Sequence, residues 1–210
     1  SLPLIDAKIA ISKDYFAKNK KKRWITNVHS RRRTHVIRSN YNCIISTSKS
    51  INDDNSLLNC RIDGLEKKSP DLVILDRNLK IKKRLKLFNN MKYRKILLVT
   101  CKTDSSKISF LKKRGVKILF MKKLNSYEDF KILFLKLKIK YSRILIEAGL
   151  NLTNFFIKNR LIKNIFIFRS NYNLKNQGFN NSSPNIIKKI KLKNQINVNL
   201  FGDKLYKEKL

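Results

Sequence analysis

Three places in the sequence combine chemically active side chains near the predicted ends of strands. They are Lys8 with Trp24-Ile25-Thr26, the segment from Ser50 to Arg61, and Glu147-Ala148-Gly149. Ammonium, guanidinium and carboxylate groups at such positions can bind phosphates and move protons. The sequence lacks the motifs GxxxxGKS/T, GxGxxG, GxSxG and HExxH, so these three places are where the chemistry has to be sought.

The third place has the pattern of an anion site. Glu147-Ala148-Gly149 follows an apolar strand and leads into a helix predicted over 151–158. The first turn of that helix contains Asn151, Leu152 and Thr153. Free backbone N–H groups at a helix start attract phosphate, and Gly149 would let a ligand come close to the backbone. A glycine required only for the turn fits the segment equally well, so the segment alone leaves both interpretations open.

Composition limits the class of protein. The 210 residues are 42% hydrophobic, which is enough for one packed core. The longest apolar runs, such as 96–99 and 165–168, have about four residues, whereas a membrane-spanning helix needs roughly 20. The cysteines Cys43, Cys60 and Cys101 form no CxxC pair, and no Cys/His group has zinc-ligand spacing. We therefore expect a cytoplasmic protein in a reducing compartment, with no structural metal and no membrane association.

The net charge is strongly positive, at +35 from 49 Lys and Arg against 14 Asp and Glu. Such a charge attracts any polyanion through counterion release. Lys18 to Arg23 and Arg31-Arg32-Arg33 form clusters, whereas the other basic residues are spread over nearly every segment. Most Phe and Tyr residues lie in apolar periods instead of alternating with the clusters. We expect non-specific binding to nucleic acid at most, and a basic RNA-binding or ribosome-associated protein remains the alternative.

The apolar pattern also predicts the elements that must position these groups. Strands are predicted at 4–12, 42–46, 57–61, 72–75, 96–100, 116–120, 143–146, 165–168, 196–201 and 204–206. Helices are predicted at 27–38, 105–114, 127–140 and 151–158, and loops at 13–23 and 172–184, with a polar segment around Asp53 and Asp54. Gly202-Asp203 reads as a hairpin turn between the last two strands. This order predicts one α/β domain with a mixed, mostly parallel sheet flanked by helices and a C-terminal antiparallel hairpin.

The order and spacing of several motifs resemble a known family. In chain order the motifs are Lys8, Lys-Arg-Trp-Ile-Thr at 22–26, Arg31-Arg32 with Arg38, Cys43-Ile44-Ile45, Asn52-Asp53-Asp54 with Leu58 and Arg61, Val73-Ile74-Leu75-Asp76, and Ile146-Glu147-Ala148-Gly149. From about residue 4 to residue 178 they resemble the reductase domain of the bifunctional riboflavin-biosynthesis deaminase–reductase. The resemblance implies a dihydrofolate-reductase-like fold, NADPH as the cofactor, and reduction of 5-amino-6-(5-phosphoribosylamino)uracil to its ribitylamino product.

The resemblance also implies roles for individual residues. Cofactor-contact positions are Ala10, Trp24, Thr26, Ser50, Asp54, Gly149, Asn151, Leu152 and Thr153. Substrate-contact positions are Arg38, Leu58, Arg61 and Glu147. Guanidinium groups bind a sugar phosphate bidentately, which suits the two arginines, although solvated surface arginines are the other interpretation in so basic a sequence. Glu147 would assist proton transfer and Lys8 would orient the ribose hydroxyls. We expect Glu147 and Asp54 to line one cleft.

Some positions depart from the family pattern. They are Tyr15, Lys22, Ser56, Arg77 and Leu150. These departures bear on affinity and activity, and a degenerate member that binds the cofactor weakly without turnover is a third interpretation. The H-x-E and P-C-x-x-C patterns of the zinc deaminase half do not occur here, and the sequence starts at Ser1. We expect residues 1–210 to be a single reductase domain from the C-terminal part of a longer chain, forming a homodimer that binds a small sugar-phosphate substrate.

Overall fold

The computed structural model describes residues 2–89, 91–180 and 186–210. The chain forms two compact units, and each is described by itself. Unit 1 contains Leu2 and Pro3 together with Val36–Leu145, and unit 2 contains Leu4–His35 and Ile146–Leu210. Of the loop predicted over 172–184, residues 181–184 lie outside the described residues.

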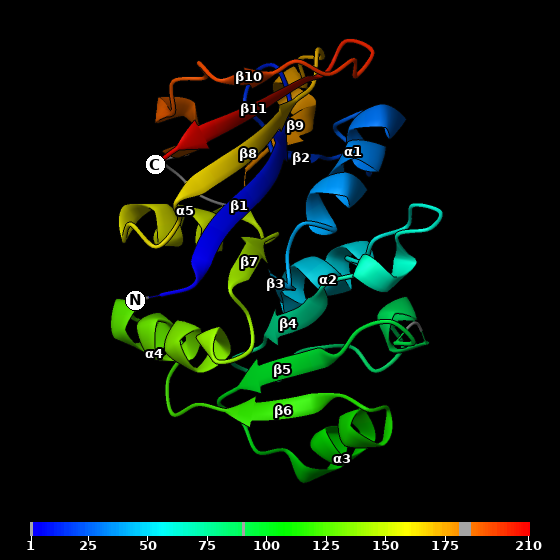
Figure 1. Cartoon of the computed structure of the whole chain (residues 1–210), viewed down its shortest axis with the longest axis vertical. Coiled ribbons are helices and arrows are strands. Elements are labelled where there is room, and N and C mark those ends of the chain that lie inside the picture. Colours follow the sequence, from blue (N-terminus) through cyan, green and yellow to red (C-terminus); the bar gives the residue numbers. More distant parts are fainter. Residues whose placement is uncertain (1, 90, 181–185) are drawn as a thin grey trace. The chain divides into compact units, whose positions relative to one another are not determined.

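Unit 1 is built on parallel strands. They are β3 (Cys43–Thr47), β4 (Asp71–Leu75), β5 (Ile96–Thr100), β6 (Lys117–Phe120) and β7 (Arg143–Ile146), whose last residue enters unit 2. The strands follow one another in the order β7-β3-β4-β5-β6, and the pairs β3–β4, β4–β5 and β5–β6 are parallel (Figure 1). Leu72, Val73 and Ile74 in β4 are fully buried, which explains why this strand is an unbroken apolar run.

The helices of unit 1 have clear start and stop signals. They are α2 (Ser48–Asp54), α3 (Ser105–Lys113), α4 (Tyr127–Lys138) and the 3₁₀ turns η1 (Glu66–Lys68) and η2 (Lys86–Asn89). A capping box between Ser126 and Asp129 starts α4, which buries apolar side chains at helical spacing. Beyond the end of α3, Gly115 adopts φ +81°, a left-handed conformation that glycine accepts without strain after a helix C-terminus.

Unit 2 combines a parallel strand pair with an antiparallel set at the C-terminus. Its strands β1 (Leu4–Ile11), β8 (Asn164–Arg169), β10 (Gln195–Ile196) and β11 (Lys204–Lys209) follow the order β10-β11-β8-β1. β1 and β8 are parallel, whereas β11 is antiparallel to both β8 and β10. The other elements are β2 (Lys18–Asn19) paired with β9 (Gly178–Phe179), α1 (Val28–Arg38), which continues into unit 1, α5 (Leu150–Lys158), η3 (Lys175–Gln177) and η4 (Ile186–Lys189).

These observations confirm the predicted fold class and correct several local predictions. Residues 57–61 are not a strand, because Leu58 has φ +52° and the carbonyls of this segment bind arginine side chains instead of a neighbouring strand. The polar segment around Asp53 and Asp54 is the helix α2, which begins at the N-cap Thr47. The predicted loop over 13–23 contains the short strand β2.

The strand predicted over 196–201 is much shorter in the structure, where β10 ends at Ile196. Only Gln195 and Ile196 pair with β11, and residues 197–200 leave the sheet. The Leu200 carbonyl accepts a hydrogen bond from the Asn27 side chain at 2.6 Å, so this segment is held at the start of α1 instead. The antiparallel connection itself occurs as predicted.

Candidate active site

Two predicted site residues lie on the same face of β1. Lys8 and Ala10 are half-buried, whereas Ile9 between them is buried on the opposite face. Ala10 lies opposite Phe168 of β8, and Nζ of Lys8 lies 5.4 Å from the centroid of the Phe168 ring. This ring therefore supports the ammonium group on a partly exposed face of unit 2, where it can meet hydroxyl groups of a ligand.

The segment between β7 and α5 consists of Glu147, Ala148 and Gly149, all half-buried. Gly149 is the N-cap of α5 with φ −66° and ψ 164°, and no side chain caps the first amides of the helix. Residues of any type adopt these angles, so the turn does not itself require glycine. The first N–H groups of a helix have no partner within the helix, and this start can therefore bind an anion.

The predicted cofactor contacts in the first turn of α5 differ in accessibility. Asn151 is exposed, Leu152 is half-buried and Thr153 is fully buried. Oγ1 of Thr153 has no hydrogen-bond partner within the described part of the chain. A buried hydroxyl without a partner costs free energy. The amides at this helix start, which no side chain caps, fit a cofactor that carries phosphate groups.

Trp24 is the one aromatic residue among the predicted contacts, and it is exposed. Its side chain is 51% exposed, and the guanidinium groups of Arg23 and Arg31 lie over its ring at 4.6 Å and 5.0 Å from the centroid. Nη1 of Arg31 also donates a hydrogen bond of 2.8 Å to the carbonyl of Thr26, which is buried. An exposed ring with two adjacent cations suits a flat ligand that carries negative charge.

The start of α1 is fixed by a residue that the sequence analysis placed only in a turn. Oδ2 of Asp203 accepts the backbone N–H of Asn27 at 2.9 Å and the hydroxyl of Ser30 at 2.7 Å. Oδ1 of Asn27 caps the helix by accepting the backbone N–H of Ser30 at 3.0 Å. The C-terminal segment thus positions the residues that follow Thr26. No local pattern in the sequence links Asp203 to Asn27, so this contact could not be found there.

Ser50 and Asp54 lie on α2 in unit 1. Oγ1 of Thr47 accepts the backbone N–H of Ser50 at 3.2 Å and donates to its hydroxyl at 3.0 Å. Ser50 is half-buried and Asp54 is exposed in the last position of the helix. Asp54 belongs to unit 1 and Glu147 to unit 2, so the expectation that both line one cleft remains a prediction.

Three of the four predicted substrate contacts come together at one bend in unit 1. The bend covers residues 57–59, and Leu58 is buried there with φ +52°. Nη1 of Arg38 donates to the backbone carbonyl of Asn59 at 3.0 Å, and Nη1 of Arg61 donates to its side-chain Oδ1 at 2.7 Å. One asparagine therefore holds both arginines that were predicted to bind phosphate.

Arg94 completes this group, although the sequence analysis did not single it out. Its side chain is only 6% exposed, and its two terminal nitrogens donate to the carbonyls of Leu57 and, at 2.7 Å, Leu58. Within the described residues it makes no ion pair. Burial and then the charge of Arg38 lower the pKa of Arg94 to about 10, and the same two causes lower the pKa of Arg61. Arg38, Arg61 and Arg94, hereafter the arginine cluster, therefore repel one another, and an anion would relieve this repulsion.

Comparison with known proteins decides the family. Residues 3–170 match the model of a family described as the RibD C-terminal domain. The chain belongs to the RibD C-terminal domain family. The riboflavin biosynthesis protein RibD of Aquifex aeolicus is 26% identical over 147 residues, which make up 70% of this chain and 39% of that protein. The chain thus spans 39% of the length of this curated relative.

Solved structures share the fold of this RibD C-terminal domain. The riboflavin biosynthesis reductase Rib7 of Saccharomyces cerevisiae matches with a TM-score of 0.74 at 20% identity, over 99% of this chain and 90% of that one. A diaminohydroxyphosphoribosylaminopyrimidine deaminase/5-amino-6-(5-phosphoribosylamino)uracil reductase of Thermotoga maritima matches with a TM-score of 0.75 at 18% identity, over 99% of this chain and 56% of that one.

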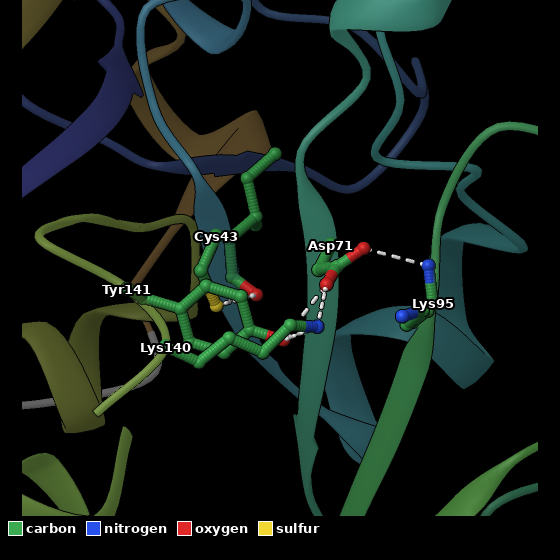
Figure 2. A network of polar contacts seen from close by, with 6 residues as sticks. Cys43, Asp71, Lys95, Lys140 and Tyr141 are labelled. Atoms are coloured by element: carbon green, nitrogen blue, oxygen red, sulfur yellow. Dashed lines mark hydrogen bonds and ion pairs between the residues drawn. The ribbon is translucent and has the colours of Figure 1, made fainter. Parts of the chain in front are cut away.

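In a second polar group of this domain, the carboxylate of Asp71 accepts hydrogen bonds from three neighbouring residues. Oδ2 of Asp71 accepts Nζ of Lys140 and, at 2.8 Å, the hydroxyl of Tyr141, while Oδ1 accepts the backbone N–H of Lys95 at 2.7 Å (Figure 2). Burial alone would raise the pKa of Asp71, but these hydrogen bonds outweigh it and lower that pKa. We call Asp71, Lys95, Lys140 and Tyr141 the Asp71 cluster, and it joins the start of β4 to the segment before β7.

The thiols of the RibD C-terminal domain are not placed for nucleophilic chemistry. Cys43 and Cys60 are buried, Cys101 is half-buried, and burial raises the pKa of all three thiols. In the described ranges, no group of three or more His, Cys, Asp or Glu side chains could hold a metal ion. No helix within those ranges is both long enough and apolar enough to cross a membrane.

Proposed function

We propose that this RibD C-terminal domain is an NADPH-dependent reductase that converts 5-amino-6-(5-phosphoribosylamino)uracil to 5-amino-6-(5-phosphoribitylamino)uracil. The observation that carries the proposal is the family match over residues 3–170, a range that contains every predicted contact residue. The names of two proteins with this fold support it. One is a riboflavin biosynthesis reductase, and the other name includes this uracil reductase activity.

The cofactor would be held by residues that have unused capacity for binding. The uncapped start of α5 offers backbone N–H groups of Gly149, Asn151 and Leu152 to phosphate, and we assign a further cofactor contact to Thr153. The exposed ring of Trp24 offers a flat surface beside two guanidinium groups. We assign further cofactor contacts to Ala10, Thr26, Ser50 and Asp54. NADPH, when bound, supplies the hydride.

The substrate phosphate would be held by the arginine cluster. Arg38 and Arg61 are both bound to Asn59, so their guanidinium groups are fixed at one place before a ligand arrives. Guanidinium binds phosphate through two parallel hydrogen bonds, which fixes the orientation of the sugar as well as its position. Leu58, buried in the same bend, would contact the substrate through its apolar side chain.

Reduction of the opened ribosylamino group needs a hydride at C1′ and a proton at the adjacent nitrogen or oxygen. We assign the proton transfer to the carboxyl group of Glu147, which is half-buried directly after β7 and would also contact the substrate. Lys8 would orient the ribose hydroxyls from the partly exposed face of β1. Neither residue needs to form a covalent bond with the substrate.

Turnover of the named substrate tests this proposal. The full chain should oxidise NADPH only when the phosphoribosylaminouracil is present, with the ribitylamino product identified by mass spectrometry. Glu147→Gln should lower kcat about 100-fold, which is the usual contribution of a positioned proton donor. Glu128→Gln is the matched control, because Glu128 is exposed on α4. Product formation by Glu147→Gln at the wild-type rate would remove Glu147 from the reaction.

Cofactor binding can be followed separately from turnover. The chain contains a single tryptophan, so quenching of its fluorescence by NADPH reports on Trp24 alone. We expect saturable quenching by NADPH that a short RNA does not reproduce. Quenching by any polyanion, with an affinity that falls steeply with salt, would favour the basic RNA-binding protein instead.

We also propose that the domain forms a homodimer. With a net charge of +35 on each chain, repulsion between two copies should weaken association at low ionic strength. Sedimentation at several salt concentrations should therefore show more dimer as salt is added. A monomer at every salt concentration would contradict the proposal.

A further inference from the structure

Arg94 is a charged residue in a buried position, where a side chain that served only packing would be apolar. It is buried just before β5, and its hydrogen bonds go to two successive carbonyls of the bend, those of Leu57 and Leu58. The next carbonyl, that of Asn59, accepts Nη1 of Arg38. Three successive carbonyls thus face two buried guanidinium groups, and this arrangement fixes the backbone from which Arg61 extends.

Burying a cation in this way costs free energy unless another charged group interacts with it. A buried guanidinium that binds only carbonyls keeps its full positive charge, whereas an ion pair would cancel most of it. Asp71 is the acidic group that acts on Arg94, but its oxygens already accept Lys140, Tyr141 and the N–H of Lys95. The charge of Arg94 therefore remains available to a ligand.

The three charges of the cluster act on one another. Arg38 contributes to the lowered pKa of both Arg61 and Arg94, and Arg61 contributes to that of Arg94. Burial is the larger cause of both lowered pKa values, and the neighbouring guanidinium charges act in the same direction. An arrangement of this kind favours a multiply charged anion over water or a neutral ligand.

We propose that Arg94 is a positioning residue for the phosphate of the substrate. It holds the bend at 57–59 so that Arg38 and Arg61 can bind the same phosphate group. Its buried positive charge also strengthens the attraction for that dianion. The identity of the substrate rests on the proposed function, whereas the phosphate site rests on the contacts around Asn59. The two can therefore be tested apart.

Binding of ribose 5-phosphate to the full chain tests the proposal without turnover. Calorimetry should show that Arg94→Met weakens this binding roughly tenfold or more, because hydrogen bonds to charged groups are at stake. Arg94→Lys should give an intermediate loss, because its ammonium keeps the charge but cannot hold both carbonyls. Arg84→Met is the matched control and should bind like the wild type, since Arg84 is exposed in the same unit. Unphosphorylated ribose should not distinguish any of these proteins.

Kinetics separate positioning from general damage to the fold. In variants that retain the wild-type circular dichroism spectrum, KM for the phosphorylated substrate should rise by the same factor as the dissociation constant, while kcat stays within about twofold. Should both Arg94 variants fail to fold, hydrogen exchange on the wild type decides the question. Ribose 5-phosphate should then slow exchange of the amides at 57–61.

Each outcome has one meaning. Wild-type affinity in a folded Arg94→Met, or no protection at 57–61, overturns the role of Arg94 even if the chain is an active reductase. Loss of ribose 5-phosphate binding in Arg94→Met, in a chain that never oxidises NADPH, keeps the phosphate site and overturns the proposed function. A wild-type chain that does not bind ribose 5-phosphate overturns the role of Arg94 as well.

Discussion

The Asp71 cluster and the arginine cluster both lie in unit 1. Of two residues adjacent in the sequence, Arg94 and Lys95, each contributes to a different cluster. Lys95 gives its backbone N–H to Asp71, whereas the side chain of Arg94 enters the arginine cluster. In the Asp71 cluster the carboxylate accepts hydrogen bonds from an ammonium, a hydroxyl and a backbone N–H, and the ammonium of Lys140 balances its negative charge. In the second, Arg94 binds only carbonyls, and no ion pair within the described residues offsets its charge.

This difference teaches how a binding site can be found in so basic a chain. Positive charge is everywhere in the sequence, with 49 Lys and Arg, and is therefore no guide by itself. A buried cation without an opposite charge is uncommon, because it costs free energy that folding alone does not return. The Asp71 cluster should therefore affect stability, and the arginine cluster should affect binding.

The largest expected effect is that of Arg61→Met on activity. Loss of a guanidinium from the proposed phosphate site should lower kcat/KM about 100-fold, as for other charged pairs. The free energy of unfolding should change by less than about 0.5 kcal/mol, because Arg61 is exposed. Steady-state kinetics and urea unfolding measure the two quantities, with Arg84→Met as the control. An equal loss with an unphosphorylated substrate would show that Arg61 does not recognise phosphate.

Asp71→Asn should have the opposite profile. It removes the carboxylate that holds Lys140 and Tyr141, and the free energy of unfolding should fall by about 2 kcal/mol. KM should stay within about twofold of the wild type. Asp63→Asn is the matched control, because Asp63 is exposed. A rise in KM without a loss of stability would break the distinction between the clusters.

Acid should weaken the Asp71 cluster and leave the charge of Arg94 unchanged. Burial would raise the pKa of Asp71, but its hydrogen bonds lower it below its usual value. The folded state therefore favours the ionised form, and this stabilisation is present above a pH of about 4 and is lost as pH falls through the lowered pKa. Between about pH 6 and pH 3, the wild type should lose roughly 1 kcal/mol more unfolding free energy than Asp71→Asn. Parallel pH profiles for the two proteins would contradict this.

Tyr141→Phe should give the smallest effect. It removes one hydrogen bond to Asp71 and leaves those from Lys140 and Lys95, so stability should fall by about 1 kcal/mol. Tyr93→Phe serves as the control, since Tyr93 is exposed. No change in urea unfolding for Tyr141→Phe would mean that Lys140 and Lys95 sustain the cluster without the tyrosine hydroxyl.

The regular elements of the fold could be predicted because their patterns are local. The apolar run of β4 and the helical spacing of α4 each lie within a dozen neighbouring residues. The same local argument was wrong for residues 57–61, where apolar side chains suggested a strand. Arg94 holds the carbonyls of that segment from more than thirty positions further along the chain, with sequence separations of 36 and 37.

The candidate site divides in the same way. Arg38 and Arg61 were found through an ordered set of motifs, and the structure places both on Asn59. Nothing in the sequence marks Arg94 as a site residue, because one arginine among 49 Lys and Arg is expected to lie on the solvated surface. The helix α2 was missed because it is mostly polar, although Thr47 before it is a typical N-cap that could have indicated it.

The antiparallel strand β11 has a practical consequence for anyone who produces this protein. The family match ends at residue 170, yet β11 covers one edge of β8, and Leu205 lies opposite Phe168. A version truncated at that boundary would expose a row of unpaired backbone groups, which invites aggregation. It would also lose Asp203 and with it the anchor of Asn27. Expression should therefore retain every residue to Leu210, with any purification tag attached beyond it through a flexible linker.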